Sequence, residues 1–192
     1  MRKKSEASSK RTQLIETAIE LFAKDGFHAT GIDTIAERSG VTKKTLYTHF
    51  RSKEELILAT LHHYADRFRN EFMRQVDRQA RTPKTRLLAI FDVAEKWFKK
   101  ENFYGCMFIN ATGEYSKNDA SIRHICIEYK RLMNGYIQEL CQKFMAREPN
   151  KLAEEIALLL EGAIVTAQVS QQPTAAKIAK RVAAILIDKR SC

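Results

Sequence analysis

The sequence is poor in glycine and proline, with 7 Gly and 3 Pro among 192 residues. An ordinary chain carries about 12% of these two residues together. An all-β sandwich or barrel needs a turn residue at nearly every hairpin, so the scarcity excludes that class. It also excludes collagen and low-complexity chains. Because 44% of the residues are apolar, the chain can bury a core. The composition therefore predicts an all-α protein.

Long apolar runs and catalytic motifs are also missing. Wholly apolar stretches such as Ile156–Leu160 are far shorter than the roughly 20 residues of a membrane span. The chain has no glycine-rich nucleotide loop, no Gly-x-Ser-x-Gly and no His-Glu-x-x-His. The adjacent His62 and His63 point about 100° apart on a helix and make no metal clamp. We therefore expect no enzyme, no metal, no cofactor and no membrane partner.

The four cysteines, Cys106, Cys126, Cys141 and Cys192, form no Cys-x-x-Cys pair. Cys126 and Cys141 share one predicted helix and lie roughly 22 Å apart along it, too far for a disulfide. No apolar segment follows the charged N-terminus, so no secretory signal is indicated. We expect free thiols in a cytoplasmic protein.

The net charge of +10 is concentrated in the first half of the chain. Residues 1–100 hold 21 Lys or Arg and 13 Asp or Glu, whereas residues 101–192 hold 12 and 10. This asymmetry favours a polyanionic partner, either nucleic acid or an anionic membrane surface. A generally basic soluble protein is the alternative reading. A protein that binds nucleic acid through charge alone is a further rival, and it would bind all sequences equally.

Apolar residues recur at helical spacing along most of the chain. The pattern predicts helices over residues 10–25, 53–80, 84–100, 103–115, 120–146, 150–170 and 174–188. Asp25-Gly26 ends the first of them. Pro83, Pro149 and Pro173 each precede a helical pattern, which suits proline in a first turn. No internal repeat or long linker interrupts the series.

Residues 30–55 have the pattern of two tightly crossing helices. Thr30, followed by Asp33, predicts a start like a capping box. The helix then runs to Ser39, and Gly40 closes it in a left-handed conformation. Thr42 caps a second helix that runs through Phe50. A short turn between two such helices indicates a helix-turn-helix unit, whose second helix enters the DNA major groove.

The second helix of this unit offers hydrogen-bonding and basic side chains and no carboxylate. Its predicted exposed face consists of Thr42, Lys43, Lys44, Thr45, Tyr47, Thr48 and His49. Such side chains bind phosphates and base edges. Ser52 and Glu55 form a capping box for the next helix, where Lys53 and the N–H groups can hold another phosphate. An ordinary helical hairpin with a solvated basic face is the alternative.

A family resemblance lies in the run from Thr30 to Leu56. It contains Ile-Ala-x-x-Ser-Gly-Val-Thr-x-x-Thr-Leu-Tyr-x-His-Phe-x-Ser-Lys-Glu-x-Leu, from Ile35 onward. This run, together with the preceding Leu21-Phe22-Ala23-Lys24-Asp25-Gly26-Phe27, resembles the DNA-binding head of TetR-family transcriptional regulators. The close match covers roughly residues 10–60. Lys44 departs from the pattern, because many members carry glycine there.

The resemblance implies a three-helix DNA-binding head over residues 1–52. It also implies a larger helical domain over residues 53–192 that binds a small effector and dimerises. A homodimer would place two heads on a palindromic operator, and the effector would release it. Repression is the favoured mode, and activation stays open. By position, the resemblance implies the DNA contacts Thr30, Thr42, Lys43, Lys44, Thr45, Tyr47, His49 and Lys53.

Residues 150–188 carry broad apolar stripes that favour a dimer surface. The stripes consist of Leu152, Ile156, Leu159, Leu160, Ala163, Ile164, Ala167, Ala175, Ala176, Ile178, Ala179, Val182, Ala183, Ala184, Ile185 and Leu186. Packing within one chain is the alternative. An effector pocket is expected among the helices at 84–100, 103–115 and 120–146. Its candidate residues are Trp97, Phe98, Phe103, Met107, Phe108, Asn110, Glu114, Tyr115, His124, Tyr129 and Met133.

Cys106 follows Gly105 at the expected start of a helix. A helix N-terminus lowers a thiol pKa and favours the thiolate. Some TetR-family members that resemble this stretch sense electrophiles through cysteine. The alternative function is therefore a redox- or electrophile-responsive regulator that uses Cys106, and a small buried cysteine is the competing interpretation.

Overall fold

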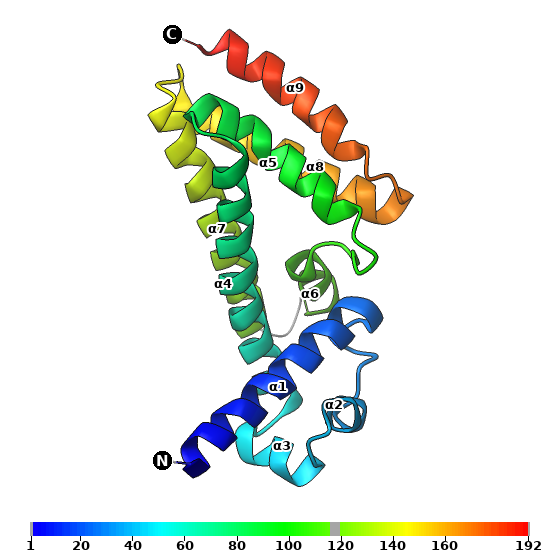
Figure 1. Ribbon diagram of the computed structural model, residues 1–192. Coiled ribbons are helices and arrows are strands. Elements are labelled where there is room, and N and C mark those ends of the chain that lie inside the picture. Colours follow the sequence, from blue (N-terminus) through cyan, green and yellow to red (C-terminus); the bar gives the residue numbers. More distant parts are fainter. Residues whose placement is uncertain (1, 116–119, 192) are drawn as a thin grey trace. The chain divides into compact units, whose positions relative to one another are not determined.

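The computed structural model describes residues 2–115 and 120–191, with side chains from Ser9 onward. All regular structure in this part of the chain is helical (Figure 1). The helices are α1 (Arg2–Asp25), α2 (Ile32–Ser39), α3 (Lys43–His49), α4 (Lys53–Gln79), α5 (Pro83–Phe98), α6 (Met107–Tyr115), α7 (Ala120–Lys143), α8 (Pro149–Ser170) and α9 (Ala175–Lys189). The all-α prediction is confirmed, although α1 begins earlier and α6 later than the pattern indicated.

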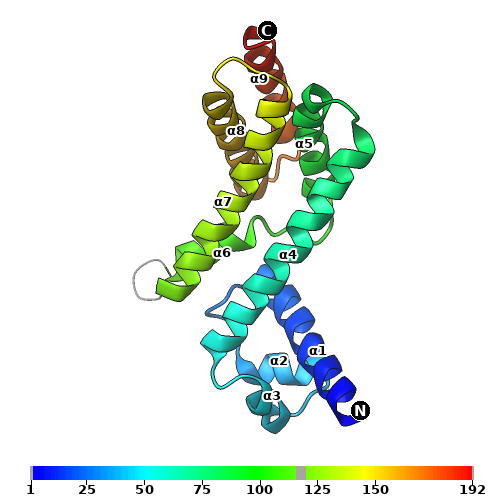
Figure 2. The ribbon, with the colours of Figure 1, turned by 90° about the vertical axis from the view of Figure 1, so that its left-hand side faces the viewer.

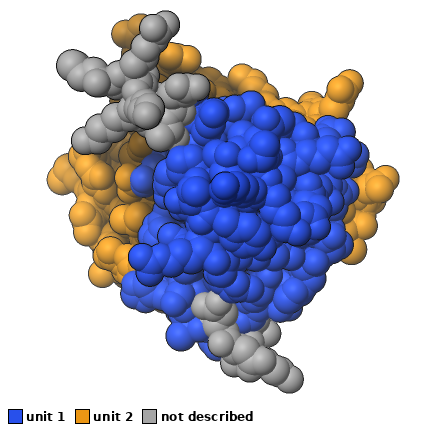
Figure 3. Space-filling model, turned by 90° about the horizontal axis from the view of Figure 1, so that it is seen from below, with its two compact units in different colours: residues 1–67, 107–127 blue, residues 68–106, 128–192 orange. Residues whose placement is uncertain are grey.

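The described chain falls into two compact units (Figure 3). Unit 1 consists of residues 1–67 and 107–127, and unit 2 of residues 68–106 and 128–192. The divisions between these units lie inside α4, at the start of α6 and inside α7.

Unit 1 is built on the packing of α1, α2 and α3 (Figure 2). Phe22 of α1 stacks on Phe27 of the following turn, with ring centroids 4.9 Å apart. The fully buried core residues of this part are Leu14, Ala18, Phe22, Phe27, Ile35, Leu46, Phe50, Leu56, Ile57 and Leu61. All but Phe27 and Phe50, which follow α1 and α3, come from the apolar positions of four consecutive helices, so their burial holds α1–α3 against the start of α4.

The predicted start of α2 at Thr30 is wrong. Gly31 occupies the N-cap position, and no side chain caps the helix there. The hydroxyl of Thr30 donates instead to the carbonyl of Gly26, at 2.6 Å. That carbonyl lies at the end of α1, where helix carbonyl groups lack partners. Thr30 therefore closes α1 instead of opening α2.

Unit 2 is built on the packing of α5, α8 and α9 (Figure 1). Ala175, Ala176, Ala179 and Ala183 are buried along α9, and such small side chains let helices approach closely. Ion pairs join α9 to both neighbours. Lys180 contacts Asp92 of α5 at 2.7 Å, and Arg190, just after α9, contacts Glu155 of α8 at 2.6 Å.

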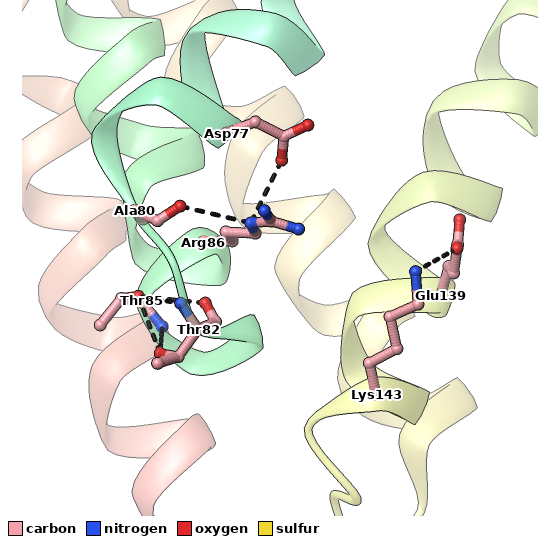
Figure 4. Close-up of polar contacts among 7 residues, drawn as sticks. All are labelled: Asp77, Ala80, Thr82, Thr85, Arg86, Glu139 and Lys143. Carbon is pink, nitrogen blue, oxygen red and sulfur yellow. Dashed lines mark hydrogen bonds and ion pairs between the residues drawn. The ribbon is translucent and has the colours of Figure 1, made fainter.

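The prolines mark helix starts as the sequence predicts. Pro83 and Pro149 lie in the first turns of α5 and α8. At α5 the cap is reciprocal (Figure 4): the N–H of Thr85 donates to the Thr82 hydroxyl at 3.2 Å, and the N–H of Thr82 donates to the Thr85 hydroxyl at 3.1 Å. Pro173 precedes α9 by two residues.

Three further observations concern features that the described residues lack. None of their helices is both long and apolar enough to cross a membrane. Across the same residues, no group of three or more His, Cys, Asp or Glu side chains is arranged to hold a metal ion. Cys106, Cys126 and Cys141 are buried and form no disulfide, and Cys192 lies outside the described residues.

Candidate functional site

The turn between α2 and α3 depends on Gly40. Its φ of 65° lies in the left-handed region, which side chains with a Cβ avoid. The N–H of Gly40 donates to the carbonyl of Glu37, and the N–H of Val41 donates to that of Ala36, both at 3.1 Å. This pair of bonds is a Schellman motif, which ends α2 and turns the chain sharply. The predicted left-handed stop is confirmed.

Helix α3 is anchored by one buried side and presents the other to solvent. Leu46 is fully buried and Val41 nearly so. The hydroxyl of Thr42 accepts the N–H of Thr45 at 3.2 Å, which confirms the predicted cap. Thr42, Lys43, Lys44 and Thr48 are exposed, and Tyr47 has 47% of its surface exposed. Thr45 and His49 are half-buried, so the predicted face is open to a partner at Thr42, Lys43, Lys44, Tyr47 and Thr48.

The two lysines at the start of α3 have different surroundings. The Lys43 ammonium pairs with Asp33 of α2 at 2.7 Å. This hydrogen bond and the carboxylate charge raise the pKa of Lys43 above its usual value. Lys44 makes no ion pair with any described residue. The acid-free face therefore has one lysine that is held by the chain itself and one that is available to an anion.

The start of α4 carries a further predicted contact residue, Lys53. The hydroxyl of Ser52 caps the N–H of Glu55 at 3.2 Å. The carboxylate of Glu55 accepts the N–H of Arg51 at 2.7 Å, one residue before the donor that a capping box would use. The ammonium of Lys53 donates to the carbonyl of His28 at 3.2 Å, so it lies against the turn after α1.

Thr30 does not share the exposed face. Its side chain is 3% exposed, and its hydroxyl bonds within the chain. A DNA contact through this side chain is therefore incompatible with its position, because the atoms that would bind are covered. The resemblance alone suggested it, and burial was not visible in the local pattern.

Glu114 of α6 holds the turn that connects α1 to α2. Its two carboxylate oxygens accept the backbone N–H groups of Phe27, at 2.9 Å, and His28, at 2.6 Å. The rings of His28 and Tyr115 lie 4.5 Å apart. A methyl group on Gly26 would come within 3.1 Å of the carboxylate, so glycine permits this approach. All these residues belong to unit 1.

Unit 2 contains a cavity with a largely apolar wall. Its volume is about 30 Å³, and about 460 Å³ of empty space, open solvent included, lies between its lining residues. The lining residues come from α4, α5, α7, α8 and the segment before α6. They are Phe68, Phe72, Trp97, Cys106, Tyr129, Lys130, Met133, Asn134, Ile137, Ala157, Leu160, Glu161 and Ile164.

The cavity has one ion pair on its wall. The ammonium of Lys130 on α7 lies 2.9 Å from the carboxylate of Glu161 on α8. Aromatic side chains also line this cavity. Phe68 and Trp97 pack edge to face, with ring centroids 4.8 Å apart. An apolar space with a few polar groups is the usual form of a small-molecule site.

Only part of the predicted effector set lines this cavity. Trp97, Tyr129 and Met133 do, and so does Cys106, which was predicted separately as a possible thiol sensor. Phe98 is 6% exposed and packs on Phe103 in the core of unit 2. The other predicted residues lie in unit 1, whereas the whole lining lies in unit 2: they are Met107, Phe108, Asn110, Glu114, Tyr115 and His124.

Several cavity residues escaped sequence reasoning. Leu160 and Ile164 were assigned to a dimer surface because they lie on an apolar stripe, but they are buried within the chain. The Lys130–Glu161 pair joins residues on two helices, and no local spacing indicates it. The sequence signal that could have indicated the pair was one charged residue, Lys130 or Glu161, within the apolar pattern of each helix.

The segment before α6 approaches α8 closely. Gly105 has a φ of 85°, and a Cβ there would lie 1.9 Å from the side-chain oxygen of Gln168. The left-handed backbone and the lack of room for a Cβ therefore both favour glycine at position 105, next to Cys106. The thiol itself is 5% exposed and forms part of the cavity wall.

The exposed apolar residues of α8 and α9 form two stripes. On α8 they are Leu158, Val165 and Val169, and on α9 they are Ile178, Val182 and Ile185. Most of the α8 stripe predicted for dimerisation is instead core, including Leu152, Ile156 and Ala163. The correction has a simple cause. Helix α8 is apolar on two sides, and the sequence alone does not say which side meets α5 and α9.

Comparison with known protein families matches two separate parts of the chain. Residues 14–60 match the model of the bacterial regulatory proteins of the tetR family. Residues 83–183 match the model of the tetracyclin repressor-like C-terminal domain. The first match covers the helix-turn-helix unit, and the second covers most residues that line the cavity.

Individual relatives match either the head or most of the chain. The helix-turn-helix transcriptional activator FasR of Mycolicibacterium smegmatis is 51% identical over 57 residues, which are 30% of this chain and 26% of FasR. The chain thus matches about a quarter of the length of FasR. The repressor ComR of Escherichia coli is 27% identical over 166 residues, which cover 82% of this chain and 79% of ComR.

Solved structures share the fold along nearly the whole chain. A TetR-family regulator from Streptomyces coelicolor has a TM-score of 0.87 at 22% identity, covering 96% of this chain and 97% of that one. NemR of E. coli in its reduced form has a TM-score of 0.82 at 20% identity, covering 93% and 97%. The chain belongs to the TetR family of transcriptional regulators, which are DNA-binding proteins and not enzymes.

Proposed function

We propose that this regulator is a cytoplasmic homodimer that represses transcription from a palindromic operator and is released by a small molecule bound in the unit 2 cavity. The observation that carries the proposal is this cavity, since an aromatic-walled space with one ion pair suits a small effector. The match to the repressor ComR over most of the chain favours repression over activation.

The DNA contacts follow from exposure and charge. Lys44 and Tyr47 extend from the open face of α3, where an α-helix fits the major groove. Lys43 reaches a phosphate only by leaving Asp33. We assign the contacts to Thr42, Lys43, Lys44, Thr45, Tyr47, His49 and Lys53, leaving out the buried Thr30.

The homodimer is supported by the two exposed stripes of α8 and α9. Leu158 and Val169 are 73% and 76% exposed, and exposed apolar patches of this kind mark interaction sites. Two helices from each chain would bury the stripes in a four-helix bundle. The symmetry of such a dimer matches a palindromic operator, because each head then meets an equivalent half-site.

The test is a selection from a random-sequence duplex library with the full-length protein, followed by footprinting on the enriched sequence. We expect one palindrome that survives excess competitor DNA. Recovery of no common sequence, with affinity that depends only on salt, would instead indicate binding through charge alone. A screen for compounds that release the protein from this palindrome then tests whether a small molecule acts as the effector.

A second candidate function is a thiol-based response at the same cavity, favoured by the position of Cys106 in its wall. An electrophile that enters the cavity would reach this thiol. Burial raises the pKa of Cys141 to about 11, so that thiol is poorly reactive and serves as an internal comparison.

The thiol-based response is tested with Cys106→Ser and the electrophile N-ethylmaleimide. The reagent should release the operator from the parent protein and not from the variant. Equal release from both proteins eliminates this candidate. Mass spectrometry should find the adduct on Cys106 before Cys141.

A further inference from the structure

The apolar wall of the cavity of unit 2 has an aromatic part beside its aliphatic part. Phe68, Phe72, Trp97 and Tyr129 contribute four aromatic side chains. The ring centroids of Phe68 lie 4.8 Å from Trp97 and 5.9 Å from Phe72. Such a cluster offers both ring faces and ring edges, the surfaces against which another aromatic ring packs. This aromatic cluster therefore offers a packing surface for a planar ring.

The charge in the cavity determines what such a ring carries. Lys130 and Glu161 are the charged residues among the lining side chains, and they pair at 2.9 Å. Their exposure differs: the Lys130 side chain is 27% exposed and the Glu161 side chain is 40% exposed. Glu161 is thus the partner that returns to water more easily.

Three classes of ligand have different consequences for this pair. A carboxylate replaces Glu161 on Lys130, so the more buried charge keeps a partner. A cation has to displace Lys130 from Glu161, which leaves the more buried ammonium without one, an unfavourable state. A neutral ligand gains no ion pair from either residue.

The size of the cavity limits the ligand. The cavity volume of about 30 Å³ holds about two water molecules. A ring therefore enters only when flexible side chains move. Met133 is adaptable because it is unbranched, and Glu161 moves outward when it is replaced. These movements make room for one ring and not for a polycyclic compound.

We propose that this cavity binds a compact aromatic carboxylate, with its ring among Phe68, Phe72 and Trp97 and its carboxylate on Lys130. The assignment rests on the proposed function only in making the occupant an effector. The binding itself is a property of unit 2.

Trp97 makes the binding measurable, because it is the single tryptophan of the chain and lies in the cavity wall. The full-length protein is titrated with three probes of one shape and different charge: phenylacetate, phenylacetamide and 2-phenylethylamine. We expect a saturable change in Trp97 fluorescence with phenylacetate at concentrations where the other two give none. Equal binding of the amide or the amine, or no response to any probe, overturns the proposal.

Two variants test the roles of the ion pair in opposite directions. Lys130→Met should weaken phenylacetate binding about tenfold or more, the effect of losing a hydrogen bond to a charged group. Glu161→Gln should tighten it about two- to fivefold, because it removes a weak competing ion pair. If Lys130→Met disturbs folding, judged by circular dichroism, the Glu161→Gln result decides. Weaker binding by that variant contradicts the assignment.

The matched controls use an ion pair within α7 that lies away from the cavity lining. Lys143 and Glu139 pair at 2.6 Å on the same helix and do not line the cavity (Figure 4). Lys143→Met and Glu139→Gln should leave phenylacetate binding unchanged. A loss of affinity in these variants equal to that of Lys130→Met would show a general charge effect and would refute a specific contact.

Operator release separates this inference from the proposed function. Phenylacetate that binds at Trp97 without releasing the operator supports the ligand class and contradicts the effector role. A different compound that releases the operator while phenylacetate leaves Trp97 unchanged supports the effector role and contradicts the ligand class.

Discussion

The carboxylate of Glu114 accepts the backbone N–H of His28 at 2.6 Å, across 86 positions of the sequence. Its other oxygen accepts the N–H of Phe27. Glu114→Gln should lower the free energy of unfolding by about 1 kcal/mol, because the amide keeps one acceptor and turns N–H groups toward the second donor. Thermal unfolding measures the change. Glu20→Gln, exposed on α1, is the control and should have no effect. Equal stability of Glu114→Gln and the parent would contradict the role assigned to these bonds.

Lys44→Ala should weaken operator binding and make log K less dependent on log salt by about one unit of slope, as for the loss of one phosphate contact. Binding is measured by fluorescence anisotropy at several salt concentrations. Tyr47→Ala should also weaken binding without unfolding the protein. Lys24→Ala, at the end of α1 and outside the α3 face, should behave like the parent. An unchanged slope for Lys44→Ala would reject the phosphate contact.

Asp33→Asn should have the opposite effect. It releases Lys43 from its ion pair, so the lysine becomes available to a phosphate. Lys43 stays protonated near neutral pH in both proteins, because its ordinary pKa is already 10.5. The salt dependence should therefore steepen by about one unit of slope. The double variant Asp33→Asn with Lys43→Ala should lose this gain. A gain that persists without Lys43 would point to another cause.

Gly40→Ala should destabilise the protein by about 1–2 kcal/mol, since alanine is strained at a φ of 65°. Nothing lies within 4 Å of the Cβ it would add, so crowding makes no contribution. Gly135→Ala provides the comparison. This exposed helical glycine also has open space around it, and alanine there should stabilise by about 0.5–1 kcal/mol. Denaturant unfolding of the two variants should thus show shifts of opposite sign.

Leu158→Glu combined with Val169→Glu should convert the proposed dimer to a monomer, because the change places charges on the exposed stripe of α8. Sedimentation velocity reports the oligomeric state. Ile127→Glu is the control, since Ile127 is 56% exposed and lies on α7 in unit 1. A double variant that remains dimeric would locate the interface elsewhere.

Local chemistry made the α2–α3 region predictable. The turn at Gly40 and the cap at Thr42 are properties of neighbouring residues, so the sequence pattern predicts them directly. The same reasoning failed at Thr30, because its hydroxyl could cap α2 or bond to the carbonyl of Gly26 after α1, and it makes the second of these bonds. Local patterns name the possible partners of a side chain and do not rank them.

Local sequence patterns did not predict contacts between helices that are far apart in the sequence. Glu114 was predicted to lie in the effector pocket as a polar residue in an apolar segment, but its partners are backbone groups 86 and 87 positions away. Lys130 and Glu161 were missed because their pairing depends on how α7 packs on α8. Trp97, Tyr129 and Met133 were found because aromatic and flexible apolar residues are common in any such wall.

The bonds of Glu114 have a consequence for chimeric regulators. A head exchanged over residues 1–52 would bring new side chains to the turn after α1. The carboxylate of Glu114 bonds only backbone N–H groups there, so these two bonds do not depend on the identity of residues 27 and 28. They depend on the shape of the turn, for which Gly26 is required. Donor heads with a glycine at this position should therefore be interchangeable on this scaffold, whereas others should need a new partner for Glu114.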